Sequence, residues 1–199
     1  NFCNKIGVHF LKNQNTEQRL LLQVEGYQNT AAFKLANMLS EIDLFELEKQ
    51  ELSLEIMNSL IISKKLRLGN RVEYFFEWLL NQQSNFEILM KSIQVVQDKI
   101  TIGELDFLIL DKQFSKTIHI EIANKFYLYD NNIKLEAERW IGPNRNDSLV
   151  QKCQKLKTKQ FPLLLHSRTK EIIEAEGHCL HMTHPNIIAP LLLTFINEK

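Results

Sequence analysis

Three consecutive segments rich in β-branched and aromatic residues constrain the fold of this chain more than any other feature. Residues 86–98 read FEILMKSIQVVQD, residues 99–111 read KITIGELDFLILD, and residues 117–130 read TIHIEIANKFYLYD. In the third segment isoleucine recurs at every second position from Ile118 to Ile122. An apolar residue at every second position is typical of a strand with one face in the core. These segments therefore predict three neighbouring strands at the centre of a β-sheet.

Helical patterns lie on both sides of these strands. After Gly69, five apolar residues recur with the i, i+3, i+4, i+7, i+8 spacing of an amphipathic helix: Val72, Phe75, Phe76, Leu79 and Leu80. Residues 146–160 predict a second helix with Asn146 or Asp147 as its N-cap, and residues 161–167 predict a short apolar strand. This order of elements predicts an α/β or α+β fold in which helices flank a central mixed four-stranded sheet.

The length of the chain, 199 residues, suits one domain with a substantial core and smaller appended parts. We assign the core to residues 61–170, where the strand and helix patterns are strongest. Residues 1–60 are expected to form a mostly helical N-terminal extension packed on this core. Residues 171–199 are expected to form a C-terminal extension, and their apolar end suggests that further chain follows.

Two of the predicted strands each carry an acid in an apolar framework. Asp106 lies in the GELD stretch of the second strand, and Glu121 lies in the third. If these strands pair as neighbours, the two carboxylates lie roughly 5 Å apart and repel each other. A divalent cation removes this repulsion, and Mg²⁺ takes carboxylate oxygens together with water and phosphate. The pair therefore predicts a site for Mg²⁺ or Mn²⁺.

A third acid borders this arrangement, and each acid also has a structural interpretation. Glu73 lies about 90° from the centre of the apolar stripe on the first helix, so it borders the core and is a candidate to approach the two strands. Alternatively, Glu73 is a solvated or salt-bridged residue, and Asp106 is an edge or turn residue. Glu121 and Lys125 are alternatively a structural ion pair.

Cysteine usage and hydropathy argue against two protein classes. Cys3, Cys153 and Cys179 are widely spaced without a CxxC pair, which argues against a disulfide framework and favours a reducing, cytoplasmic setting. No run approaches the ~20 apolar residues of a membrane span, so no membrane association is expected. Histidines at positions 178, 181 and 184 flank Cys179 and are a weaker candidate for zinc, with Cys153 as the distant partner.

The charges balance, with 24 basic and 24 acidic residues, so the chain as a whole has no electrostatic attraction to nucleic acid. Residues 140–159 are a local exception, because Asp147 is their only acid among several lysines and an arginine. A basic helix whose N-terminal amides are free is a reasonable phosphate contact. Arg145, Lys152 and Lys155 are therefore candidate nucleic-acid contacts, and the alternative is a solvated helix face.

Four blocks of the sequence, taken in order and spacing, resemble the PD-(D/E)XK nuclease superfamily. The blocks are LGNRVE, GELDFLI, IHIEIANKFYLYD and WIGPNRNDSLVQK, and together they cover roughly residues 66–166. They look most similar to a bacterial family of uncharacterised proteins assigned to that superfamily. The resemblance implies a restriction-endonuclease-like core for about half of the chain.

The resemblance also implies an activity. It predicts a metal-dependent nuclease that hydrolyses phosphodiester bonds in nucleic acid, with DNA expected before RNA. Asp106 and Glu121 would hold the metal, and Glu73 would be an auxiliary acid. A lysine would orient or deprotonate the attacking water and stabilise charge on the phosphate. The alternative is a catalytically inactive domain of the same fold that binds nucleic acid or a protein partner.

This lysine is where the chain departs from the superfamily pattern. The usual lysine lies two residues after the glutamate, at the position of Ala123. Lys125 shares the predicted strand face, but it begins about 13 Å along the strand from Glu121, so a bulge would be needed to shorten the path. We assign Lys125 to the catalytic set, with Lys152 of the following helix as its substitute.

Overall fold

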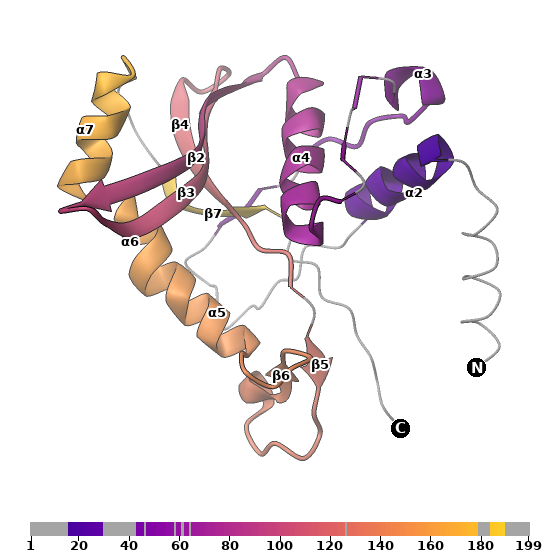
Figure 1. The fold of residues 1–199 in the computed structure, drawn as a ribbon, viewed down its shortest axis with the longest axis vertical. Helices are drawn as coiled ribbons and strands as arrows, with labels where there is room; N and C mark the ends of the chain where they lie inside the picture. The colour runs from indigo at the N-terminus through magenta and orange to yellow at the C-terminus, as the bar shows by residue number, and fades with distance from the viewer. Residues whose placement is uncertain are drawn as a thin grey trace. The chain divides into compact units, whose positions relative to one another are not determined.

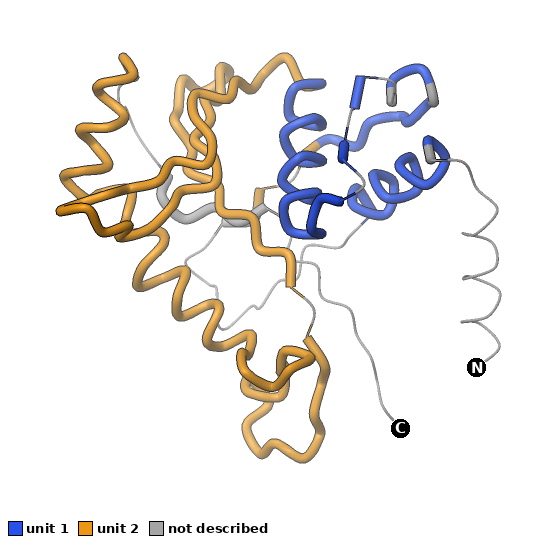
Figure 2. The backbone as a smooth tube through the Cα atoms, viewed as in Figure 1, with its two compact units in different colours: residues 1–30, 48–82 blue, residues 31–47, 83–199 orange. Residues whose placement is uncertain are grey.

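The computed structural model divides the chain into two compact units (Figure 2). Unit 1 comprises residues 1–30 and 48–82, and unit 2 comprises residues 31–47 and 83–199. The residues that the structure describes are 16–29, 43–45, 47–57, 59–60, 62–63, 65–125, 127–178 and 184–189. None of the described helices has the length and apolar composition that crossing a bilayer requires.

Unit 1 is helical in its described residues and contains α2 (Thr16–Gln28), α3 (Leu54–Met57) and α4 (Leu68–Asn81). Helix α2 packs against both α3 and α4. The amphipathic helix predicted after Gly69 is confirmed as α4, which begins at Leu68, one residue before this glycine. All five residues of the predicted apolar stripe are buried.

Side-chain hydrogen bonds tie the segments of unit 1 together. The Gln28 carboxamide donates to the Gln50 backbone carbonyl at 3.1 Å and accepts from the Gln50 backbone N–H at 2.7 Å. It thus satisfies both backbone polar groups of Gln50. Trp78 of α4 is also buried, and its indole N–H donates to Ser59 Oγ at 2.9 Å. These contacts connect α2 and α4 to the segment between them.

Unit 2 is built around a five-stranded mixed sheet in the order β1-β7-β4-β3-β2 (Figure 1). The strands are β1 (Asp43–Leu44), β2 (Phe86–Gln97), β3 (Ile100–Asp111), β4 (Lys116–Ile122) and β7 (His184–Ala189). Strands β2, β3 and β4 pair antiparallel, whereas β7 pairs parallel with both β4 and β1. The combination of helices with a mixed sheet confirms the α+β class.

The first two predicted strands are confirmed as β2 and β3. They form a hairpin whose two turn residues, Asp98 and Lys99, have φ of 50° and 65°. Positive φ at both turn residues matches the type I′ turn, whose twist suits a hairpin. The third predicted strand is confirmed only as far as Ile122, where β4 ends. β4 pairs with β3 as far as Ile120 and with the described part of β7 as far as Ile122, and the chain leaves β4 at Ala123.

The strand predicted at residues 161–167 is wrong, because this segment is helical. It contains α6 (Phe161–Leu163), with Pro162 in the first turn of the helix. A short apolar run does not distinguish a buried strand from a buried helix, and proline is tolerated in a first helical turn but not within a sheet. The prediction of four strands is corrected to five, since β1 and β7 come from segments assigned to the extensions.

The helices of unit 2 follow one another as α5 (Leu149–Lys155), the π-helical η2 (Leu156–Gln160), α6 and α7 (Ser167–Ala175). Figure 1 shows α6 and α7 beside the β2–β3 hairpin, and α5 extending towards the two short strands β5 (Leu128–Tyr129) and β6 (Trp140–Ile141). These two strands pair antiparallel, and the 3₁₀ turn η1 (Glu136–Arg139) lies between them in the chain.

The second predicted helix is therefore confirmed, but its N-cap is neither Asn146 nor Asp147. Ser148 Oγ accepts from the Gln151 amide at 3.3 Å, and Gln151 Oε1 accepts from the Ser148 amide at 2.9 Å. This reciprocal capping box satisfies two backbone donors, which neither Asn146 nor Asp147 does alone.

A cluster of buried apolar side chains joins the hairpin to α6 and α7. It comprises Ile93, Val95, Leu105, Leu108, Leu163, Leu164 and Ile173. Gly103 lies at the closest approach, because a Cβ at this position would overlap the Leu163 side chain. The cluster holds the helices against the sheet beside the carboxylates described next.

Candidate functional site

Asp106 and Glu121 come from neighbouring antiparallel strands, as predicted. The register pairs Leu108 with His119 and Phe107 with Ile120, so its extension by one residue sets Asp106 opposite Glu121. Directly opposed residues of an antiparallel pair project from the same face of the sheet. Asp106 Oδ2 accepts a hydrogen bond from the Ile122 amide at 2.7 Å. The Asp106 carboxylate thus accepts a hydrogen bond from a backbone N–H at the end of β4, where the pairing of β4 with β3 stops.

Glu121 is fully buried and is held at both carboxylate oxygens. Its Oε1 lies 2.8 Å from His119 Nε2, and its Oε2 accepts from Gln160 Nε2. An ionised carboxylate only accepts hydrogen bonds, so this contact suits the His119 tautomer that has its proton on Nε2. Its Nδ1 is buried and has no hydrogen-bond partner among the described residues. These two side-chain partners compensate for the burial of a carboxylate on an otherwise apolar strand.

Lys152 is the cation associated with the two acids. Its Nζ donates to Gln160 Oε1 at 3.1 Å from the inner side of α5. Burial lowers the pKa of Lys152 below that of an ordinary lysine, whereas the negative charges of Glu121 and then Asp106 oppose this shift. Both carboxylates therefore act electrostatically on the same ammonium group.

Lys125 has a different partner. Its Nζ lies 3.2 Å from Asp147 Oδ2, and the two side chains are 50% and 42% exposed. Lys125 also contributes to lowering the pKa of Lys152, so the two ammonium groups are within electrostatic reach of each other. The structure pairs Lys125 with Asp147 and brings Lys152 to the acids, so a catalytic role for Lys125 stays a prediction.

Glu73 lies on α4, which belongs to unit 1, whereas the two strand acids belong to unit 2. Its side chain is half-buried, as expected for a residue that borders the apolar stripe. Its approach to Asp106 and Glu121 stays a prediction.

The three predicted nucleic-acid contacts do not share one surface. Lys152 points inward, Lys155 is exposed on α5, and Arg145 is 70% exposed but lies 2.7 Å from Asp130 Oδ2. The hydrogen bond from Arg145 lowers the pKa of the Asp130 carboxyl. Arg145 and Lys155 are therefore exposed at the surface, whereas Lys152 is half-buried beside the two acids.

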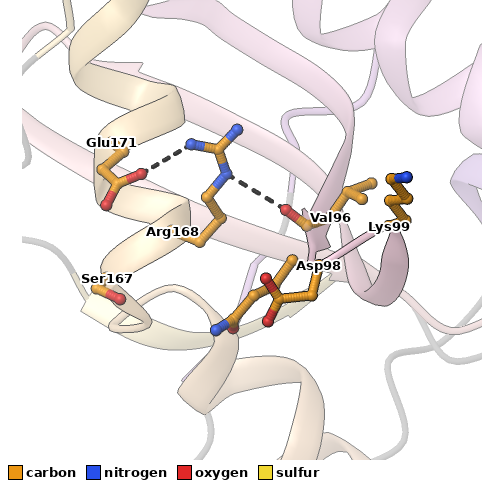
Figure 3. A pocket seen from close by; sticks show the side chains of 7 residues that line it. Val96, Asp98, Lys99, Ser167, Arg168 and Glu171 are labelled. Carbon is orange, nitrogen blue, oxygen red and sulfur yellow. Dashed lines mark hydrogen bonds and ion pairs between the residues drawn. The ribbon is translucent and has the colours of Figure 1, made fainter.

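A pocket of about 500 Å³ lies at the far end of the hairpin, beside the N-terminus of α7 (Figure 3). Arg168 crosses it, with Nε donating to the Val96 carbonyl at 3.3 Å and Nη1 to Glu171 Oε2 at 2.8 Å. The other lining residues are Gln97, Asp98, Lys99 and Ser167. None of the residues predicted for the site lines this pocket, so it is separate from the acids.

A family described as "Domain of unknown function (DUF1853)" matches residues 9–188. The chain belongs to this family. The match extends across both units and includes each of the acids and lysines described above. No curated protein and no solved structure matches the chain.

The donor set of this DUF1853 chain is suited to a hydrated hard cation. Among the described residues, no three or more His, Cys, Asp and Glu side chains are grouped to hold a metal ion. Mg²⁺ needs only one or two carboxylates, because water and phosphate complete its coordination. Each oxygen of Glu121 accepts one hydrogen bond and has a second lone pair, and Asp106 adds another carboxylate. The residues present therefore fit Mg²⁺ or Mn²⁺.

The zinc candidate has less support from its surroundings. Residues 179–183 lie outside the described residues, so most of the cluster around Cys179 is not placed. Cys153, its expected distant partner, is buried, and burial raises the pKa of the Cys153 thiol. A raised thiol pKa disfavours the thiolate that zinc binds.

Sequence reasoning missed two residues of the site. His119 precedes Glu121 by two positions on a strand, so the two share a face, and this spacing was a usable signal. Gln160 carried no such signal, because it lies eight residues after Lys152. On a regular α-helix this separation leaves the two side chains about 80° apart in direction and about two turns apart along the axis, so it does not indicate a contact.

Proposed function

We propose that this protein is a metal-dependent nuclease with a restriction-endonuclease-like core, which hydrolyses phosphodiester bonds in nucleic acid. The observation that carries the proposal is the convergence of Asp106, Glu121 and Lys152 in a partly buried site. Two carboxylates and an ammonium group are the charges that hydrolysis of a phosphodiester requires: anionic ligands for a cation, and a cation for the phosphate. DNA is expected before RNA, as the resemblance implies.

The chain's own residues have separate roles in this proposal. Asp106 and Glu121 would hold Mg²⁺ or Mn²⁺, which lowers the pKa of bound water and stabilises charge on the phosphate. His119 and Gln160 fix the orientation of the Glu121 carboxylate. The Lys152 ammonium faces the anionic substrate, and its lowered pKa brings it closer to the range in which it exchanges protons near neutral pH.

The decisive test removes the charge of one carboxylate and keeps its hydrogen bond. Asp106→Asn retains an oxygen that accepts from the Ile122 amide, so the end of β4 stays capped. We expect wild type to cleave plasmid DNA in Mg²⁺ or Mn²⁺, and the variant to lose at least about 100-fold in rate. Calorimetry should show that the variant also loses Mg²⁺ binding.

The matched control is Asp98→Asn, an exposed aspartate in the β2–β3 turn of the same hairpin. Its backbone has positive φ, which asparagine accepts. The control should cleave and bind Mg²⁺ like wild type. Equal cleavage by Asp106→Asn and wild type would show that the strand acids do not bind a catalytic metal.

One observation favours a second function, a nuclease fold that binds nucleic acid without cutting it. Both oxygens of Glu121 already accept hydrogen bonds from protein donors, and Ala123 occupies the usual lysine position. This alternative predicts salt-sensitive retention of DNA and no cleavage in any divalent cation.

A further inference from the structure

A π-helical turn brings Gln160 onto the side of the helix that faces the acids. Lys152 and Gln160 are eight residues apart, which on a regular α-helix separates their directions by about 80°. The π-helical segment Leu156–Gln160 takes up one extra residue and reduces this separation to about 20°. The two side chains meet for this reason, with Lys152 Nζ 3.1 Å from Gln160 Oε1.

The chemistry of the three groups allows only one orientation of the Gln160 carboxamide. Lysine only donates and an ionised carboxylate only accepts, so the amide oxygen must face Lys152 and the amide nitrogen must face Glu121. A carboxamide is the side-chain group that makes both bonds without adding a charge. Gln160 therefore stands between an ammonium and a carboxylate that attract each other, the attraction to Glu121 being larger than that to Asp106.

Phe161, the residue after Gln160, contacts His119, the second hydrogen-bond partner of Glu121. Phe161 packs edge-on against the His119 ring, with 5.8 Å between the ring centroids. His119 holds Glu121 Oε1, and Gln160 holds Glu121 Oε2. Two consecutive residues, the last of the π-helical segment and the first of α6, thus set the position of the helix relative to β4.

We infer that Gln160 is a positioning residue, which keeps the Lys152 ammonium one carboxamide away from Glu121. Without it, the ammonium is free to close onto Glu121 as a direct ion pair. With it, Lys152 stays available to a phosphate, and Glu121 keeps lone pairs for a cation. The availability of Lys152 to a phosphate and of Glu121 to a cation rests on the proposed function. The separation of Lys152 from Glu121 by Gln160 does not depend on it.

The test follows the titration of Lys152 by NMR of the lysine side chains, without metal or nucleic acid. The Lys152 signal is assigned by its absence in Lys152→Met. In Gln160→Ala the ammonium moves to Glu121, and its pKa should rise by about one unit or more, as for a charge that gains a close opposite charge. An unchanged Lys152 titration would overturn the inference.

Two further variants keep this test decisive. Gln154→Ala changes an exposed glutamine of the same helix and should leave the Lys152 titration as in wild type. Gln160→Asn shortens the carboxamide by one methylene, so it cannot reach both partners. It should raise the Lys152 pKa in the same direction, and it serves if Gln160→Ala does not fold.

Calorimetry with Mg²⁺ separates this inference from the proposed function. Gln160→Ala should weaken Mg²⁺ binding about tenfold, because the Lys152 ammonium then competes with Mg²⁺ for Glu121. The double variant Gln160→Ala with Lys152→Met should bind Mg²⁺ as tightly as Lys152→Met alone. If wild type binds no Mg²⁺ and cuts no nucleic acid, the proposed function fails while the NMR titration still decides the role of Gln160. Equal weakening with and without Lys152 would mean that Gln160 does not act through the lysine.

Discussion

The site around Glu121 and the loop of residues 125–148 both place basic residues beside acids, but they hold their charges in different ways. At the site, Glu121 is fully buried, and a neutral carboxamide separates it from a half-buried lysine. In the loop, Lys125 pairs with Asp147 and Arg145 with Asp130, and each basic side chain is half exposed or more. Buried charges must be satisfied by directed donors, whereas exposed pairs exchange freely with water.

The difference shows why proximity of opposite charges does not identify a functional site. The two loop pairs are direct ion pairs of 3.2 and 2.7 Å, yet their basic side chains are half exposed or more, and ion pairs open to water contribute little to stability. The charges at the site act in a region that water reaches less, where each is worth more to a bound anion or cation.

The largest expected effect comes from removing the buried carboxylate. Glu121→Ala leaves the buried His119 donor and the half-buried Gln160 donor without an acceptor, so we expect a loss of roughly 3–5 kcal/mol in the free energy of unfolding. Asp147→Ala is the matched control in the loop and should cost less than about 1 kcal/mol. Urea unfolding monitored by circular dichroism measures both. Similar losses in the two variants would abolish the contrast between the regions.

The second expected effect separates the two lysines. Lys152→Met should reduce nuclease activity by about 100-fold or more, the range expected for loss of a group that donates protons or stabilises the phosphate. Lys125→Met removes an exposed partner of Asp147 and should retain activity within about threefold of wild type, since such pairs are worth little. Initial rates of plasmid cleavage at saturating Mg²⁺ provide the comparison. A reversed order would restore Lys125 as the catalytic cation.

Much of this arrangement was predictable from local pattern. Alternating apolar residues gave β2 and β3 nearly to their ends, and the placement of Asp106 and Glu121 on neighbouring strands followed from it. The helix that carries Lys152 was also predicted, although its cap at Ser148 was missed. These elements are specified by short-range periodicity, which a single sequence contains.

The rest depends on contacts between distant segments. Residues 161–167 are as apolar as a buried strand, but in the structure Phe161 and Leu163 are buried from a helix. Strand β7 joins the sheet from a segment that shows no clear alternation. The choice between Lys125 and Lys152 depended on where β4 ends, and the role of Gln160 depended on a π-helical turn that no spacing rule predicts.

A smaller effect sharpens the comparison through pH. Because burial lowers the pKa of Lys152 in the folded protein, the unfolded chain binds more protons between that lowered pKa and the ordinary value of 10.5. Stability should therefore rise with pH across this window in wild type relative to Lys152→Met. Burial raises the pKa values of Tyr127 and Cys153, which act in the opposite sense at high pH but are common to both proteins. A flat difference between the two unfolding curves would show that Lys152 is not desolvated.

The smallest effect is expected at Asp130, where the cause of the pKa shift is a hydrogen bond and not burial. Arg145→Ala removes the first cause of the lowered Asp130 pKa, so NMR titration should show this pKa rising towards its ordinary value. The return is incomplete, because the Asn132 amide still donates to the carboxylate at 3.0 Å. A carboxyl with a lowered pKa stabilises the fold above its unfolded pKa and loses this contribution as pH falls, so the variant should lose that acid dependence.

Salt distinguishes the two causes. About 1 M salt shortens the screening length to roughly 3 Å and should raise the Asp130 pKa in wild type by less than Arg145→Ala does, because salt weakens the charge attraction of Arg145 but leaves its hydrogen bond in place. The lowered pKa of Lys152 should change little, because its main cause is desolvation and salt does not restore the water that burial excludes. If salt shifted the pKa values of Asp130 and Lys152 equally, Lys152 would be as accessible to water as the loop. The two regions would then differ only in the arrangement of their side chains.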